Sequence, residues 1–186
     1  MENKKTVTEI FKVALILFAI TAIAAAILAG VNNITAPVIA ENDRKAQNAA
    51  MQEVLPDATE FTSIEFEKSE ASTVSEIYKS NAGYAVKVAP YGYGGAISMI
   101  VGVDSELKVT GIKIISQSET AGLGAKCTAS SFQEQYKGKT ENIVVSKNGA
   151  KGNEIDAISS ATVTSKAVTK GVNEAIDAVK NIKGDE

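Results

Sequence analysis

The sequence of 186 residues contains no histidine, no tryptophan and a single cysteine, Cys127. Without an imidazole, a Ser-His-Asp triad, a histidine-ligated zinc site and a haem with a histidine ligand are all excluded. One cysteine can neither form an internal disulfide nor hold an iron–sulfur cluster. If this protein carries electrons, its cofactor must therefore be organic.

Neither sign of charge is in large excess, because 19 Lys and Arg oppose 22 Asp and Glu for a formal net charge of −3. This balance gives no electrostatic reason to expect nucleic acid as a partner. The length leaves room for one soluble domain plus an anchor.

Charged residues are absent from 13–31, where Thr21 is the only polar interruption of an apolar run. About 20 apolar residues are needed to cross the hydrocarbon of a bilayer, so this run predicts a transmembrane helix over 13–31. A cleavable signal peptide is the main alternative, because Ala24–Ala26 and Ala29 resemble small-residue cleavage sites. The length of the run favours a retained anchor. A buried helix of a soluble protein is a further alternative.

Basic residues lie nearer to the first end of this segment than to its second end. Residues 1–12 contain Lys4, Lys5 and Lys12, whereas the next basic residue is Arg44. Because cytoplasmic flanks are enriched in Lys and Arg, 1–12 is predicted to be cytoplasmic. The chain would then cross the cytoplasmic (inner) membrane once, in contact with its lipid, and its C-terminal domain would lie outside the cytoplasm.

The stretch 36–56 has a helical composition, with Pro37 suited to a first-turn position and Pro56 at its end. It predicts a juxtamembrane helix that connects the anchor to an extracytoplasmic domain over 57–186. A flexible linker is the alternative, because Asn, Gln and Ala are frequent in it.

Short β-rich segments separated by turns follow in the domain. The clearest pair is 96–103 and 107–115, which predicts an antiparallel hairpin closed by Asp104–Glu106. Further segments predict strands over 61–66, 74–78, 82–89 and 143–146, and a short helix over 131–136. From Val163 onward, apolar residues recur at the three-and-four spacing of one helical face. The mixture predicts an α+β domain with a mainly antiparallel sheet and a C-terminal helix packed on it.

Hydroxyl side chains gather where that last helix begins, at Ser159, Ser160, Thr162, Thr164 and Ser165. The first turn of a helix carries N–H groups without partners and partial positive charge, so it accommodates a phosphate group. Lys166, one turn beyond Thr162, would add a full positive charge. Ordinary helix capping by Ser and Thr is the alternative reading of these residues.

The order Asp-x-x-Ser-x-Ala-Thr-x-Thr-Ser, from Asp156 to Ser165, resembles the flavin-attachment motif of the FMN-binding family. That family includes the G subunit of the Rnf electron-transport complex and the C subunit of the sodium-translocating NADH:quinone reductase. The resemblance implies that Thr162, after Ala161, is esterified to the phosphate of FMN by a separate flavin transferase, with Asp156 as part of what that enzyme recognises. Ser160 replaces the family's usual glycine, and a backbone that needs positive φ would tolerate serine less well.

Two loops extend the resemblance. The loop 90–95 contains Tyr93 and Gly94 and is similar to a glycine-rich segment of the family, although an ordinary turn with exposed tyrosines is the alternative. The loop 119–124 resembles the family's Glu-Thr-Pro-Gly-Leu-Gly signature, with Ala121 in place of proline. The resemblance implies that Leu123 contacts the ring face of the flavin and that Glu119 and Thr120 shape its polar edge. Gly124 completes that loop, whose alternative role is to precede a short helix.

Taken together, these motifs imply an electron-carrying subunit of an Rnf-type, ion-translocating ferredoxin:NAD oxidoreductase that works beside other membrane and peripheral subunits. Electrons would pass through FMN covalently bound to Thr162, with no metal and no catalytic acid or base. A C-type subunit of the quinone reductase, or another FMN-binding redox protein, is an alternative with the same chemistry. A membrane-tethered extracytoplasmic binding module without a cofactor is the alternative from another class.

Overall fold

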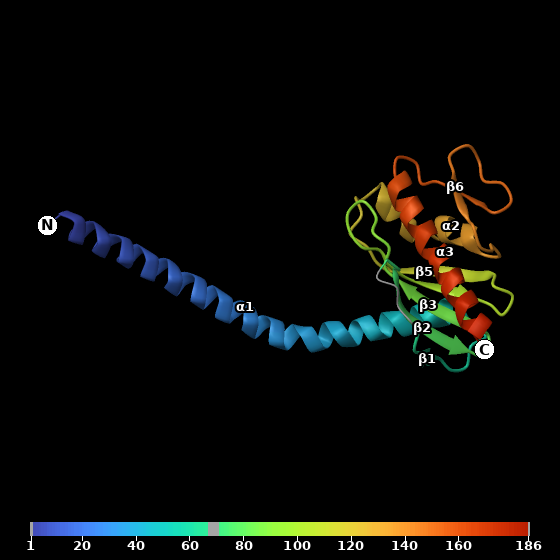
Figure 1. Ribbon diagram of the computed structural model, residues 1–186, viewed down its shortest axis with the longest axis horizontal. Coiled ribbons are helices and arrows are strands. Elements are labelled where there is room, and N and C mark those ends of the chain that lie inside the picture. The colour runs from blue at the N-terminus through green and yellow to red at the C-terminus, as the bar shows by residue number, and fades with distance from the viewer. Residues whose placement is uncertain (1, 67–70, 186) are drawn as a thin grey trace. The chain divides into compact units, whose positions relative to one another are not determined.

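The computed structural model describes residues 2–66 and 71–185, so the predicted domain 57–186 includes 67–70 and 186, which lie outside the described residues. The chain divides into two compact units, Met1–Lys45 and Ala46–Glu186. The first unit is part of one helix, and the second is an α+β domain (Figure 1).

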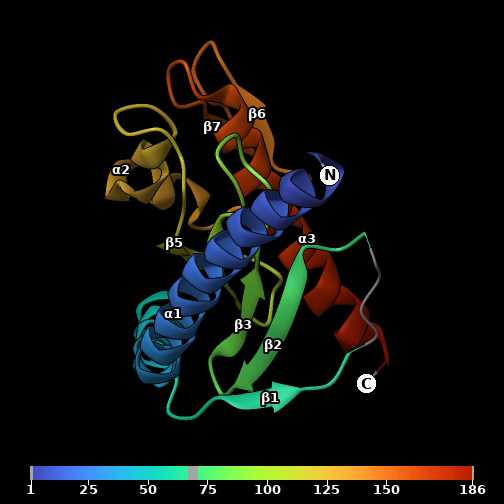
Figure 2. The same ribbon diagram turned by 90° about the vertical axis from the view of Figure 1, so that its left-hand side faces the viewer.

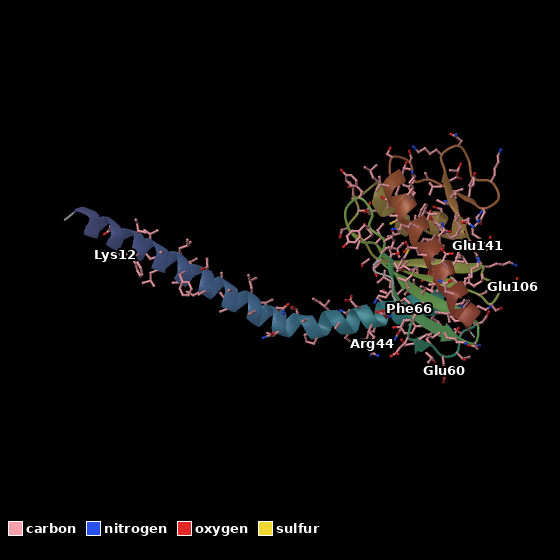
Figure 3. All side chains as sticks on the ribbon, viewed as in Figure 1. Lys12, Arg44, Glu60, Phe66, Glu106 and Glu141 are labelled. Atoms are coloured by element: carbon pink, nitrogen blue, oxygen red, sulfur yellow. The ribbon has the colours of Figure 1, made fainter. Side chains whose placement is uncertain are left out.

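Helix α1, Glu2–Val54, is apolar on every side over much of its length. Its large side chains are exposed, among them Phe11 at 74% and Phe18 at 69%. Figure 3 shows side chains projecting outward all along α1 between the labelled residues Lys12 and Arg44. No charged residue occurs from Val13 to Ala40. Within the described residues, α1 is the one helix long and apolar enough to cross a membrane, and it contains the predicted span 13–31.

Most of the predicted juxtamembrane helix 36–56 is helical, because α1 continues to Val54, but Pro37 lies inside this continuous helix and not in a first turn. The assignment of 36–56 as a juxtamembrane segment stays a prediction. A proline within a helix removes one backbone hydrogen bond and costs about 3 kcal/mol. Long helical stretches on both sides offset this local cost, since each residue added to an existing helix gains one hydrogen bond. The assignments of 1–12 to the cytoplasm, 13–31 to the membrane and 57–186 to the exterior stay predictions.

The domain is built on a five-stranded antiparallel sheet in the order β1-β2-β3-β4-β5. Its strands are β1 Thr62–Ile64, β2 Val74–Ser80, β3 Gly83–Val88, β4 Ser98–Val103 and β5 Val109–Ser116. The predicted hairpin is confirmed as β4 and β5, in which Val101 pairs with Ile112. The α+β class with a mainly antiparallel sheet is likewise confirmed.

The two faces of this sheet are buried by different helices, because side chains alternate between the faces along each strand. Val86 and Val101 lie on the face covered by the C-terminal helix α3, Thr162–Asp185. Ala85 and Ile100 lie on the opposite face, in a smaller cluster with residues 50–58 at the end of α1. Figure 2 shows β1, β2 and β3 side by side, with α3 running alongside them.

The remaining elements come between β5 and α3 in the sequence. They are the 3-10 turn η1 Gly124–Thr128, the short helix α2 Ser130–Gln133 with the turn η2 Glu134–Tyr136, and the strands β6 Val144–Ser146 and β7 Glu154–Asp156. The predicted helix 131–136 is thus the pair α2 and η2, and the predicted strand 143–146 is β6. The strand β7 was not predicted. It pairs with β6 in parallel and brings the chain to the start of α3.

Candidate functional site

The segment before α3 is held in a fixed shape by Ser165. The Ser165 hydroxyl accepts a hydrogen bond from the Ile158 N–H at 2.9 Å and donates one to the Ala161 carbonyl at 3.0 Å. Ser165 is fully buried, so its role is to brace the turn rather than to bind a ligand. Ser165 is therefore not an N-cap, because it lies inside α3 and its hydroxyl accepts an N–H from before the helix.

Ser160 adopts the left-handed backbone conformation, with φ of 62°. Such a φ costs a residue with a Cβ about 1–2 kcal/mol, whereas glycine adopts it freely. The structure therefore explains why glycine would be favoured at this position, and it shows that serine is accepted there with some strain.

A cavity of about 500 Å³ opens at the first turn of α3 and is lined by three separate segments of the chain. The glycine-rich loop contributes Tyr93. The loop after β5 contributes Glu119, Thr120, Leu123 and Gly124, and the start of α3 contributes residues 160–164. Most of the predicted site residues are thereby brought to one place: Tyr93, Glu119, Thr120, Leu123, Gly124, Ser160, Ala161 and Thr162.

The buried carboxylate of Glu119 joins these three segments. Its Oε1 accepts the Gly94 N–H at 2.8 Å, and its Oε2 accepts the Thr164 hydroxyl at 2.5 Å. Glu119 is 8% exposed and Thr164 is 1% exposed. Gly94 therefore contributes to the site through its backbone, without lining the cavity itself. The prediction gave Glu119 the polar edge of a ring, whereas here both of its oxygens are bonded to protein groups.

Glycines surround this carboxylate because larger residues would not fit. A Cβ at Gly92 would lie 2.4 Å from Glu119 Oε1, and a Cβ at Gly124 would lie 2.4 Å from Glu119 Oε2. A Cβ at Gly94 would lie 2.1 Å from the backbone carbonyl oxygen of Ser118. The absence of a Cβ at Gly92 and Gly94 lets the loop 90–95 approach the loop after β5 closely, and the absence of a Cβ at Gly124 leaves room for Glu119 within its own loop.

Three predicted site residues lie away from the cavity lining. Asp156 accepts the Ala150 N–H at 2.7 Å through Oδ1 and donates its own N–H to Gln135 at 2.6 Å, which fixes the loop before the motif. Ser159 is exposed beside Ser160. Lys166 lines a separate groove of about 450 Å³ between α3 and β6.

Sequence reasoning did not select Thr164 or Val163, although both line the cavity. The signal for Thr164 was present in the hydroxyl run, two residues after Thr162. What the sequence could not show is which of these hydroxyls is buried, because that depends on the loop carrying Glu119, far away in the chain.

The lining of the cavity combines the start of a helix with apolar side chains. Residues 162–164 of the first turn of α3 line it, and the N-terminal end of a helix carries unpaired N–H groups and partial positive charge. Tyr93, Leu123 and Val163 are 78%, 41% and 54% exposed and offer apolar surface at the rim. A phosphate and a flat ring fit these two environments, and the cavity volume lies in the range of ligand sites.

The one thiol of the sequence, that of Cys127, lies in the interior of the domain. Burial, and after it the negative charge of Glu119, raises the pKa of the Cys127 thiol to about 11. Cys127 is fully buried, so it is a neutral packing residue at neutral pH. In the described part of the chain, no cluster of Cys, Asp and Glu could hold a metal ion.

The sequence of this α+β domain matches a known family of domains. Residues 92–177 match the family described as the FMN-binding domain, and residues 1–54 match the RnfG N-terminal region. The G subunit of the Na⁺-translocating ferredoxin:NAD⁺ oxidoreductase complex of Acetobacterium woodii is 40% identical, with 98% of this chain and 99% of that protein covered. The G subunit of the proton-translocating ferredoxin:NAD⁺ oxidoreductase complex of Clostridium ljungdahlii is 35% identical, with 99% of both chains covered.

A solved structure shares the fold. The chain resembles the C subunit of the Na⁺-translocating NADH-quinone reductase of Parabacteroides distasonis with a TM-score of 0.57 at 18% identity, covering 74% of this chain and 92% of that one. The identity over nearly full length to the two G subunits is far higher. The chain therefore belongs to the family of G subunits of ion-translocating ferredoxin:NAD⁺ oxidoreductase complexes.

Proposed function

We propose that this chain is the electron-carrying G-type subunit of a membrane-bound, ion-translocating ferredoxin:NAD⁺ oxidoreductase and that it holds FMN through a phosphoester on Thr162. Family membership supports the first part. The second part rests on one observation: among the threonines of the hydroxyl run, Thr162 lines the cavity and is partly exposed, whereas Thr164 is buried on Glu119.

Bound FMN supplies reversible uptake of electrons, which a chain with a single cysteine cannot provide through a dithiol–disulfide pair of its own. The chain's own residues bind and orient it. The N–H groups of the first turn of α3 stabilise the phosphate. Tyr93, Leu123 and Val163 offer the apolar wall for the ring. No step requires a protein acid or base, which agrees with the absence of histidine.

A separate flavin transferase would form the ester from FAD. In that reaction the Thr162 oxygen forms a bond to the phosphorus nearest the riboflavin, the pyrophosphate P–O bond breaks, and AMP leaves while the hydroxyl proton passes to a base of the transferase. Asp156 would serve recognition by fixing the loop ahead of Thr162, through its bond to Ala150. A covalent bond prevents loss of the cofactor outside the cytoplasm, where the orientation predicted from Lys4, Lys5 and Lys12 places the domain.

The test is to express the full chain with a flavin transferase in membranes and to measure its intact mass and its in-gel flavin fluorescence after SDS. The wild type and Ser159→Ala should both carry one FMN adduct. Thr162→Ala should carry none. An adduct on the same peptide of Thr162→Ala would overturn the assignment of Thr162. A colourless wild type of unmodified mass would instead favour a tethered binding module without a cofactor.

A further inference from the structure

Glu119 is a buried carboxylate that has no cationic partner among the described residues. Within residues 2–66 and 71–185, no lysine or arginine forms an ion pair with it. Its two oxygens are bonded instead by a backbone N–H and a neutral hydroxyl, those of Gly94 and Thr164. Burying a charge is costly unless hydrogen bonds compensate for it, so a neutral glutamine would be the less demanding choice for a purely structural link.

The hydrogen bonds of Glu119 join three segments of the chain. Gly94 belongs to the loop before β4, Glu119 to the loop after β5, and Thr164 to the first turn of α3. Gln117 adds a further restraint, because its Oε1 accepts the N–H of Glu119 at 2.5 Å. All three walls of the cavity therefore meet at one carboxyl group.

We propose that Glu119 is a positioning residue with two effects: it fixes the two loops on the first turn of α3, and it places a negative charge beside the cofactor. This proposal rests on the proposed function. A negative charge beside a ring that gains electrons disfavours its reduced form, so Glu119 would lower the reduction potential of the bound flavin. Burial, and after it the same negative charge, raises the pKa of the Cys127 thiol.

Three variants of the full chain separate the two effects. Glu119→Gln keeps the size and both hydrogen-bonding positions but removes the charge. Thr164→Val keeps the branched shape but removes the hydroxyl from the link. Gln133→Ala is the control: Gln133 is also 8% exposed and joins two segments, from Ile114 to Thr128, but it does not line the cavity.

On flavinylated protein, the midpoint potential and the fluorescence anisotropy of the flavin are measured. Glu119→Gln should give a more positive potential with nearly unchanged anisotropy. Thr164→Val should lower the anisotropy, because the ring is held less firmly. Gln133→Ala should change neither. An unchanged potential in Glu119→Gln would overturn the electrostatic effect, and an equal change in Gln133→Ala would reduce Glu119 to an ordinary structural residue.

A readout without cofactor keeps this inference distinct from the proposed function. Hydrogen exchange of the Gly94 N–H should become about tenfold faster in Glu119→Ala, as expected for the loss of a hydrogen bond to a charged group, and stay unchanged in Gln133→Ala. Unchanged exchange at Gly94 would overturn the link even if FMN is attached. If the wild type carries no flavin, the proposed function fails, and the proposed effect of Glu119 on the reduction potential fails as well. The exchange of the Gly94 N–H still tests whether Glu119 holds the glycine-rich loop.

Discussion

The two faces of the sheet are covered by helices of opposite character. On one face, α3 buries Val168, Val172 and Ile176 against apolar strand residues, and the cavity opens at the end of this layer. On the other face, the end of α1 buries only a small cluster that includes Met51 and Leu55. The packing of the end of α1 on the sheet depends more on polar contacts than the packing of α3 does.

These contacts form a network around Gln47. Its amide donates to Glu76 at 2.8 Å and to the Tyr78 hydroxyl at 2.9 Å, while Lys87 donates to Gln47 at 2.8 Å and to Glu76 at 2.9 Å. Nearby, the Thr110 hydroxyl donates to the Val54 carbonyl at 2.6 Å. Hydrogen bonds are directional, whereas apolar contact is not, so this face specifies how the end of α1 lies on the sheet.

Most of the stability of the domain therefore comes from the α3 face, and the orientation of the end of α1 comes from the polar contacts of the α1 face. The largest loss of stability is expected for Ile176→Ala, which removes a fully buried side chain from the α3 face. Truncation of a buried isoleucine costs about 2–5 kcal/mol, from lost burial and from the cavity that remains. Urea unfolding followed by circular dichroism measures the change. Asp177→Ala, exposed on the same helix, should shift stability by less than about 0.5 kcal/mol.

The contribution of Glu76 to the stability of the α1 face should depend on pH. Burial raises its pKa, but hydrogen bonds from Tyr78, Lys87 and Gln47 and the charge of Lys87 outweigh this, so the pKa lies below its ordinary value of 4.5. A lowered pKa contributes stability that is present above the unfolded value and is lost as pH falls through the folded value. Glu76→Gln should thus cost about 1 kcal/mol at neutral pH, since the group is partly exposed, and the difference from wild type should shrink in acid.

The comparison would fail if Glu76→Gln destabilised the domain as much as Ile176→Ala does. It would also fail if the difference between Glu76→Gln and wild type grew toward acid pH. Equilibrium unfolding of both proteins across the acid range distinguishes these outcomes. Glu141→Gln, whose ion pair with Lys180 is largely exposed, serves as the control and should give a smaller effect at every pH.

The α3 face was also the part that the sequence predicted best. The three-and-four spacing from Val163 gives α3, and the alternation in 96–103 and 107–115 gives β4 and β5, because both depend on local periodicity. The continuity of α1 through Pro37 was missed, because proline is common in the first turn of a helix and therefore also indicates a helix start. The link from Glu119 to Thr164 was also missed, because it joins residues 45 positions apart and no local pattern encodes it.

The smallest expected effect lies where α3 begins. Ser160, Leu107 and Asn142 are the non-glycine residues with positive φ in the described chain, and of these only Ser160 lines the cavity. In Ser160→Gly, relief of the left-handed strain, about 1–2 kcal/mol, is partly cancelled by the greater freedom of glycine in the unfolded chain, about 0.5–1 kcal/mol. A net gain of about 0.5–1 kcal/mol is expected in cofactor-free protein, measured by urea unfolding.

Asn142→Gly is the matched control, since asparagine tolerates the left-handed region better than serine does and should gain less. A larger gain in Ser160→Gly than in Asn142→Gly would place stored strain at the wall of the cavity and nowhere on the α1 face, which has no such residue among those described. Equal or opposite changes would mean that Ser160 is stabilised by contacts of its hydroxyl. The two faces of the sheet would then differ in the polarity of their contacts, and the backbone of Ser160 would not add strain to the α3 side.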